Sequence, residues 1–127
     1  MKVVTAAPKF RQSYRDLVAW QKAREFARLI YTLTGNFPKN ETFGLTMQLR
    51  RAAVSIASNI AEGKARYSNK DFVHFLRTAR GSLAEAETQV ILSCDFGYIE
   101  ASKVEQALAS ADELSRILAG LVASLQR

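Results

Sequence analysis

The chain has 127 residues, 48% of them hydrophobic and 24% charged, a composition that fits one globular domain with a single core. No apolar run approaches the roughly 18 residues of a membrane span, and the first residues lack the apolar stretch of a secretory signal, so we expect a cytoplasmic protein with no membrane partner. The lone cysteine, Cys94, excludes an internal disulfide framework and a thiolate metal cluster within one chain, and we expect it in or near the core.

Basic residues are concentrated in the first part of the sequence. Residues 1–70 hold 13 Lys and Arg against 4 acids, a net charge of +9, whereas residues 71–127 hold 5 against 8, a net charge of −3. A basic half favours a polyanion such as nucleic acid, and an acidic half equally offers a neighbouring subunit an electrostatic partner. Charge alone therefore leaves both interpretations open.

Residues 1–15 show no sustained hydrophobic period and are predicted to form a basic N-terminal arm, which leaves residues 16–127 as the helical domain. Asp16 is a candidate N-cap for a first helix. The apolar residues that follow it at helical spacing are Trp20, Ala23, Ala27 and Ile30. Gly35 and Pro38 predict the end of this helix, because glycine ends helices readily and proline disfavours helical geometry in the residue before it.

A second helix is predicted over about residues 41–61, with Asn40 as its candidate cap and Gly63 as its stop. Its apolar face is formed by residues at steps of four and three: Leu49, Ala53, Ile56 and Ile60. A polar line runs about 100° away on the same helix. Its members are Gln48, Arg51, Ser55, Asn59, Glu62 and Arg66. Short Ser and Asn side chains between Arg and Glu indicate a surface that meets another helix, another subunit or a polyanion.

A third helix is predicted directly after Ser68, because Ser68 and Asp71 have the spacing of a capping box. Its apolar residues are Phe72, Leu76, Ala79, Leu83, Ala86 and Val90. Gly81 lies inside this helix at a cost of roughly 1 kcal/mol relative to Ala, which predicts a close helix crossing or a contact there. Ser102 and Glu105 form a second candidate capping box, at the start of a fourth helix. The apolar residues of the fourth helix are Val104, Leu108, Ala111, Leu114, Leu118, Leu121 and Leu125.

Four amphipathic helices joined by short turns predict an all-α fold, an antiparallel up-down-up-down four-helix bundle. The sequence shows no catalytic constellation. A di-iron site needs Glu-x-x-His on two helices, whereas this chain has one histidine, His74, which we interpret as a surface residue. Glu85 and Glu87 are two residues apart and point in different directions, so they do not form a carboxylate pair that holds magnesium. We therefore predict that the protein is not an enzyme and has no metal site and no cofactor.

Glu62 and Glu85 are expected to form structural ion pairs rather than to act as acid or base. The expected partners are Arg51, Arg77 and Arg80.

Several motifs in a fixed order resemble one protein family. They are LVAWQKA at residues 17–23, LRRAAVSI at 49–56, NIAEG at 59–63 and ARGSLAE at 79–85. Over about residues 14–125 the chain resembles the four-helix-bundle proteins encoded in 23S rRNA intervening sequences. The resemblance implies a left-handed four-helix bundle that assembles into a ring-like homopentamer.

The fold is also similar to that of the accessory variability determinant proteins of diversity-generating retroelements, although the chain is closer to the first family. That similarity implies a basic pentameric barrel that binds nucleic acid and a reverse transcriptase. The chain departs from the pattern in two places. Ala57 and Ser58 stand where such proteins often have a proline, so the second helix should run without a kink. Glu100 stands where a small hydroxyl often caps the fourth helix.

Two functions follow from these patterns. The first is a non-enzymatic, oligomeric accessory protein that binds RNA or DNA mainly through phosphate contacts. The candidate residues are Arg50, Arg51, Lys64, Arg66, Lys70, His74, Arg77 and Arg80. Tyr67, in the same loop as Lys64 and Arg66, fits either stacking of a base or simple anchoring of the turn.

The alternative is a structural or adaptor module whose polar seam serves subunit assembly and the binding of a protein partner, such as a nucleic-acid enzyme. The seam residues are Gln48, Arg51, Ser55, Asn59, Glu62, Gly81 and Glu85. Arg51 belongs to both sets.

Overall fold

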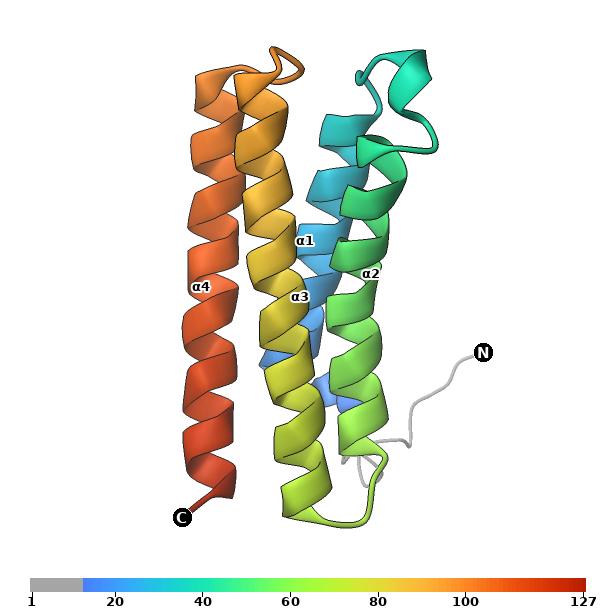
Figure 1. The fold of residues 1–127 in the computed structure, drawn as a ribbon. Helices are drawn as coiled ribbons and strands as arrows, with labels where there is room; N and C mark the ends of the chain where they lie inside the picture. The colour runs from blue at the N-terminus through green and yellow to red at the C-terminus, as the bar shows by residue number, and fades with distance from the viewer. Residues whose placement is uncertain (1–12) are drawn as a thin grey trace, which may run out of the picture.

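The computed structural model describes residues 13–127, which form four long helices that pack side by side (Figure 1). The helices are α1 (Val18–Thr34), α2 (Leu45–Lys64), α3 (Asn69–Asp95) and α4 (Ala101–Leu125). Two 3₁₀ turns, η2 (Tyr14–Asp16) and η3 (Lys39–Glu41), precede α1 and α2. The prediction of an all-α fold is confirmed, since residues 13–127 contain no strand. None of these helices combines the length and the apolar character needed to span a membrane.

The helices meet in one hydrophobic core. The apolar face predicted for α2 is confirmed, because Leu49, Ala53, Ile56 and Ile60 are all 0% exposed. The largest buried apolar side chains of the other helices are Phe26, Ile30, Leu76, Leu83, Val90, Leu114 and Leu118. Each such side chain contributes about 1.5–3 kcal/mol when it leaves water.

The connections between the helices define two ends of the bundle. Figure 1 shows the α1–α2 and α3–α4 connections at one end and the α2–α3 turn at the other, together with the end of α4. The last turn of α2 and the first turns of α3 therefore lie at the end that holds the α2–α3 turn.

The start of α1 differs from the prediction. Asp16 belongs to η2, and Leu17, which has no capping side chain, precedes α1. Ser13 caps η2 instead, since its Oγ accepts the Arg15 N–H at 3.1 Å. The Tyr14 ring packs edge-on against Trp20, with 5.3 Å between the ring centroids. Residues 1–12 of the predicted arm lie outside the described residues.

The predicted boundaries of α2 are wrong at both ends. Asn40 lies in η3, and α2 begins at Leu45, whose N–H donates to a Glu41 carboxylate oxygen at 3.0 Å. Gly63 was expected to stop the helix, yet it is buried within α2, which continues to Lys64. A Cβ at Gly63 would lie 2.7 Å from Phe75 Cβ, so this glycine permits close packing of α2 on α3.

The two predicted capping boxes have different outcomes. Ser68 precedes α3, and its Oγ accepts the Asp71 N–H at 3.1 Å, as predicted. Ser102 does not cap α4, because the helix begins one residue earlier, at Ala101, after Glu100. The Ser102 hydroxyl donates to the Glu100 carboxylate at 3.0 Å.

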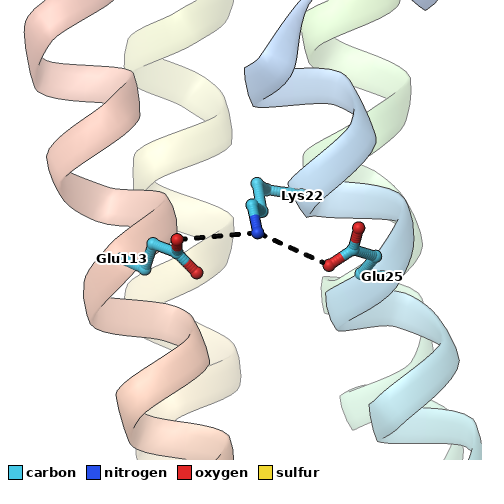
Figure 2. A network of polar contacts seen from close by, with 3 residues as sticks. All are labelled: Lys22, Glu25 and Glu113. Carbon is cyan, nitrogen blue, oxygen red and sulfur yellow. Dashed lines mark ion pairs between the residues drawn. The ribbon is translucent and has the colours of Figure 1, made fainter.

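Ion pairs on the surface join α1 to α4. Lys22 Nζ lies 3.5 Å from the Glu113 carboxylate of α4 and 3.8 Å from the Glu25 carboxylate of its own helix (Figure 2). Both carboxylates are exposed, so the pairs contribute little stability and mainly orient the side chains.

Candidate functional site

The polar line of α2 faces α3 of the same chain. Ser55 Oγ lies 2.9 Å from Ser82 Oγ of α3, and Asn59 Nδ2 donates to Ser55 Oγ at 3.0 Å and to the Ser55 carbonyl at 2.8 Å. Beside these bonds lies a hollow of about 380 Å³, which we call the polar hollow. Its lining residues are Gln48, Arg51, Ala52, Ser55, Ser82 and Glu85. Part of the predicted seam is thus a contact between two helices of one chain.

Gln89 connects the polar hollow to the core. Its Nε2 lies 3.5 Å from Gln48 Oε1 and 3.4 Å from Glu85 Oε2, and the residue is 7% exposed. Among the described residues, the buried Gln89 Oε1 has no hydrogen-bond partner. An unsatisfied buried oxygen costs about 1–3 kcal/mol, so this part of the α2–α3 contact is not optimised for stability.

The structural ion pair expected for Glu62 is present, but its partner is Arg66 rather than Arg51, Arg77 or Arg80, and the ion pair expected for Glu85 is absent from residues 13–127. Glu62 pairs with Arg66 at 2.8 Å, four residues further along the chain and just beyond the end of α2. Glu85 contacts Gln89 and no arginine within residues 13–127. Each carboxylate contacts the side chain four residues later in the chain, Arg66 just beyond α2 for Glu62 and Gln89 within α3 for Glu85.

The close contact predicted at Gly81 is absent from residues 13–127. Gly81 is exposed, and a Cβ built there would meet nothing within 4 Å. Ser82 faces α2, and Gly81 is turned about 100° away from it, which directs it out of that contact.

Arg50 is held by the end of α1. Its Nε donates to Thr34 Oγ1 at 2.7 Å and a terminal nitrogen donates to the Tyr31 carbonyl at 3.2 Å. The guanidinium carbon also lies 4.4 Å from the centroid of the Tyr31 ring. Arg50 therefore caps α1 from the neighbouring helix, through its Nε and one terminal nitrogen.

Three of the predicted nucleic-acid residues lie together beside the α2–α3 turn. Lys70, His74 and Arg77 line a hollow of about 590 Å³, which we call the basic hollow, between the start of α3 and the end of α4. The remaining residues of its wall are Asn69, Val73, Leu125 and Gln126. All three side chains are exposed, and none takes part in an ion pair within the described residues.

The other predicted basic residues are distributed around this site. Lys64 ends α2 at the same end of the bundle. Arg66 follows it, but Arg66 is paired with Glu62 and lies 4.7 Å from the centroid of the Phe75 ring. Arg51 is exposed nearer the start of α2, and Arg80 is exposed one turn beyond Arg77 on α3. The structure thus divides the predicted set into a clustered group and isolated members.

Sequence reasoning missed an apolar groove at the opposite end of α2. Phe43, Met47 and Val54 are exposed by 83%, 39% and 43%, and together with Tyr31 of α1 they line a groove of about 530 Å³. We call it the apolar groove; Arg50 and Arg51 border it. A signal was present, since Met47 and Val54 lie on the face of α2 opposite its buried face.

The perturbed carboxylates lie away from the basic hollow. The Leu45 N–H and then the Tyr98 hydroxyl, which donates at 2.7 Å, lower the pKa of Glu41. The same bond raises the pKa of Tyr98. Burial, and then the nearby charge of Asp112, raises the pKa of Glu87. Within residues 13–127, no group of three or more His, Cys, Asp or Glu side chains could hold a metal ion.

The chain was compared with known families and structures. The model of the 23S rRNA-intervening sequence protein matches residues 15–120. One similar solved structure is a protein of unknown function from the S23 ribosomal protein family of Bacteroides thetaiotaomicron. It is 26% identical in sequence, with a TM-score of 0.77, and the match covers 84% of this chain and 96% of that chain. The comparison with curated proteins found no match. Because the family model covers most of its length, the chain belongs to the 23S rRNA-intervening sequence protein family.

Proposed function

We propose that this protein binds nucleic acid through phosphate contacts at the end of the bundle that holds the α2–α3 turn. The observation that carries the proposal is the basic hollow, where Lys70, His74 and Arg77 converge without an ion-pair partner among the described residues. Cationic side chains that are not neutralised within their own chain are available to an external anion.

The distribution of charge at the two ends supports this choice of site. The α3–α4 connection, at the opposite end of the bundle (Figure 1), is flanked by Asp95, Glu100 and Glu105 against Lys103. The α3–α4 connection is therefore a less favourable site for a polyanion than the basic hollow. The cytoplasmic location expected from the sequence would give the protein access to RNA and DNA.

Salt dependence gives the test of this proposal. Each phosphate contact adds about 0.9 to the slope of log K against log salt for duplex DNA and about 0.7 for a single strand. The double variant Lys70→Ala/Arg77→Ala should weaken binding and reduce the slope by about 1.4 to 1.8. Fluorescence anisotropy with labelled RNA and DNA at several salt concentrations measures both quantities.

A matched control removes the same charge elsewhere. Lys103→Ala/Arg116→Ala takes two cations from exposed positions on α4 and should leave the slope unchanged. An equal loss of binding affinity in both double variants would show that only the net charge of the protein matters, not the basic hollow. No binding to any nucleic acid at about 50 mM salt, where phosphate contacts are strong, would remove the proposal.

A second candidate function, assembly with further copies of the chain, rests on the apolar groove. Phe43, just before α2, and Met47 and Val54 of α2 are exposed apolar residues that line one groove, a feature that marks protein interaction surfaces. We propose that this groove is a subunit interface, and that the copies close into the ring expected from the family resemblance, each an up-down-up-down bundle. A ring would repeat the basic hollow once per subunit, so assembly would strengthen nucleic-acid binding rather than compete with it.

The groove also refines the alternative of an adaptor module. Arg51 and Ser55, both predicted seam residues, line the apolar groove as well as the polar hollow. A protein partner, including a nucleic-acid enzyme, would be recognised at the same surface only if the groove is free in the assembly.

A further inference from the structure

Tyr67, at the tip of the α2–α3 turn, is completely exposed. Its relative accessibility is 107%, the highest among the exposed large apolar residues of the described chain. Both faces of its ring are therefore open to solvent. Single exposed apolar side chains are ordinary on protein surfaces, so the exposure becomes informative only through what surrounds the ring.

The turn does not need Tyr67 for its own stability. The Ala65 N–H donates to the carbonyls of Ala61 and Glu62 at 3.2 Å, and the Arg66 N–H donates to the Gly63 carbonyl at 3.1 Å. On the other side of the turn, the Ser68 side chain caps α3. The interpretation of Tyr67 as an anchor of the turn is therefore wrong, because a ring that touches nothing anchors nothing.

The ring lies next to the basic hollow along the chain. Asn69, two residues after Tyr67, lines the hollow, so the two Cα atoms are at most about 7 Å apart. Lys70 follows directly and contributes its ammonium group to the same hollow. An open aromatic face and a cationic hollow are thus placed within the reach of one nucleotide and its neighbour.

Arg66 leaves the ring of Tyr67 uncovered. Its guanidinium is turned to Glu62 and stacks on Phe75, at 4.7 Å from the ring centroid. Arg66 therefore supports the turn from the side of α2 and α3, whereas Tyr67 projects from the tip without a stacking partner within residues 13–127.

We infer that the protein prefers unpaired, single-stranded nucleic acid, with a base stacked on Tyr67 and the adjoining phosphates in the basic hollow. This inference rests on the proposed function and specifies its substrate. A base inside a duplex has both faces covered by its neighbours, so the Tyr67 ring gains a partner only from a strand whose bases are free. Stacking accepts any base, which predicts little sequence preference.

Replacement of Tyr67 tests the inference directly. Tyr67→Ala should weaken binding of an unstructured RNA or DNA strand about five- to hundred-fold and leave duplex binding unchanged. Tyr67→Phe keeps the aromatic face and should retain binding, whereas Tyr67→Leu keeps only apolar bulk and should not. Phe96→Ala removes a partly exposed aromatic ring near the opposite end of α3 and serves as the matched control.

A spectroscopic measurement reports on stacking itself. In Tyr67→Trp, addition of a single strand should quench the emission of the new indole, beyond the change that Trp20 alone shows in the unmodified protein. Thermal unfolding of each Tyr67 variant should match that of the parent protein, because the Tyr67 side chain is fully exposed.

The outcomes separate this inference from the proposed function. If Tyr67→Ala weakens the binding of neither ligand, or weakens the binding of single strand and duplex equally, the stacking inference is overturned. The proposed salt-dependent binding of nucleic acid then still stands. Absence of quenching in Tyr67→Trp at saturating single strand would overturn it as well. If the unmodified protein binds no nucleic acid at about 50 mM salt, the proposed function fails and the inference fails with it.

Discussion

Neighbouring residues of the same type have different roles in this protein. Arg50 and Arg51 adjoin in sequence, but they are turned about 100° apart on α2. Arg50 therefore reaches the end of α1, where it donates to Thr34 and Tyr31, whereas Arg51 is exposed between the polar hollow and the apolar groove. Mutation of Arg50 is expected to affect stability, and mutation of Arg51 to affect what the surface binds.

The glycines give a stability prediction at the scale of single residues. Gly63→Ala should destabilise the protein by about 1–2 kcal/mol, because overpacking against Phe75 Cβ at 2.7 Å and Phe72 Cδ1 at 3.0 Å outweighs the better helix propensity of Ala. Gly81→Ala is the matched control and should stabilise by about 0.5–1 kcal/mol, since nothing lies within 4 Å of its new methyl group. Urea unfolding of the two variants measures both changes.

The opposite sign at either glycine would contradict the packing described here. A stabilising Gly63→Ala would mean that Phe75 shifts without cost. A destabilising Gly81→Ala would indicate that another molecule packs on this exposed face of α3.

At the scale of elements, one carboxylate joins three segments. Glu41 ends η3, accepts the first free N–H of α2 from Leu45 and accepts the hydroxyl of Tyr98 from the α3–α4 connection. Tyr98 also packs against Phe37, with 5.4 Å between the ring centroids. The two connections at this end of the bundle are thereby held together by a charged group.

This arrangement predicts a dependence of stability on pH. The lowered pKa of Glu41 means that its contribution is complete above the ordinary carboxyl pKa of 4.5 and is lost as the pH falls through the lowered folded-state pKa. The stability advantage of the unmodified protein over Glu41→Gln should therefore be greatest near neutral pH and disappear in acid. Chemical unfolding at a series of pH values measures it.

Glu105→Gln, at an exposed site of α4, is the control for general effects of charge. A difference between Glu41→Gln and the parent that stays constant from neutral to acid pH would show that the carboxylate charge contributes nothing at this junction.

At the scale of the whole molecule, two functional surfaces lie at different places on the bundle. The basic hollow is at the end with the α2–α3 turn, and the apolar groove is at the start of α2, near the opposite end. Because the two surfaces are separate, copies of the chain could associate through the apolar groove and still present their basic hollows to a nucleic-acid strand. In the proposed arrangement, α2 would contribute to assembly and α3 to nucleic-acid binding.

The groove gives a prediction about assembly. Met47→Glu/Val54→Glu should convert an assembly of several chains into single chains of 14.1 kDa, because two buried carboxylates at an apolar interface are costly. Both sites are exposed in the single chain, so its fold should persist, as circular dichroism would verify. Light scattering measures the mass.

Ile91→Glu, at an exposed apolar residue of α3 outside the groove, should leave the mass unchanged. A parent protein that is already a single chain at high concentration would contradict an interface at the groove.

The sequence alone determined the helical elements and the buried faces. Apolar residues at steps of three and four placed Leu49, Ile56 and Leu83 in the core, and the Ser68 cap located the start of α3. These features are predictable because they depend on residues close together in the chain. The motifs likewise led to the family that the comparison established.

Only the tertiary structure decided which surface residues act together. The partner of Ser55 is Ser82, the neighbour of Gly63 is Phe75, and Arg50 is engaged by α1, and each contact joins segments that are distant in sequence. Periodicity gives the face on which a residue lies but not what the neighbouring helix brings to that face. For the same reason the exposed ring of Tyr67 and the basic hollow beside it became visible only once the turn and the ends of the helices were placed in space.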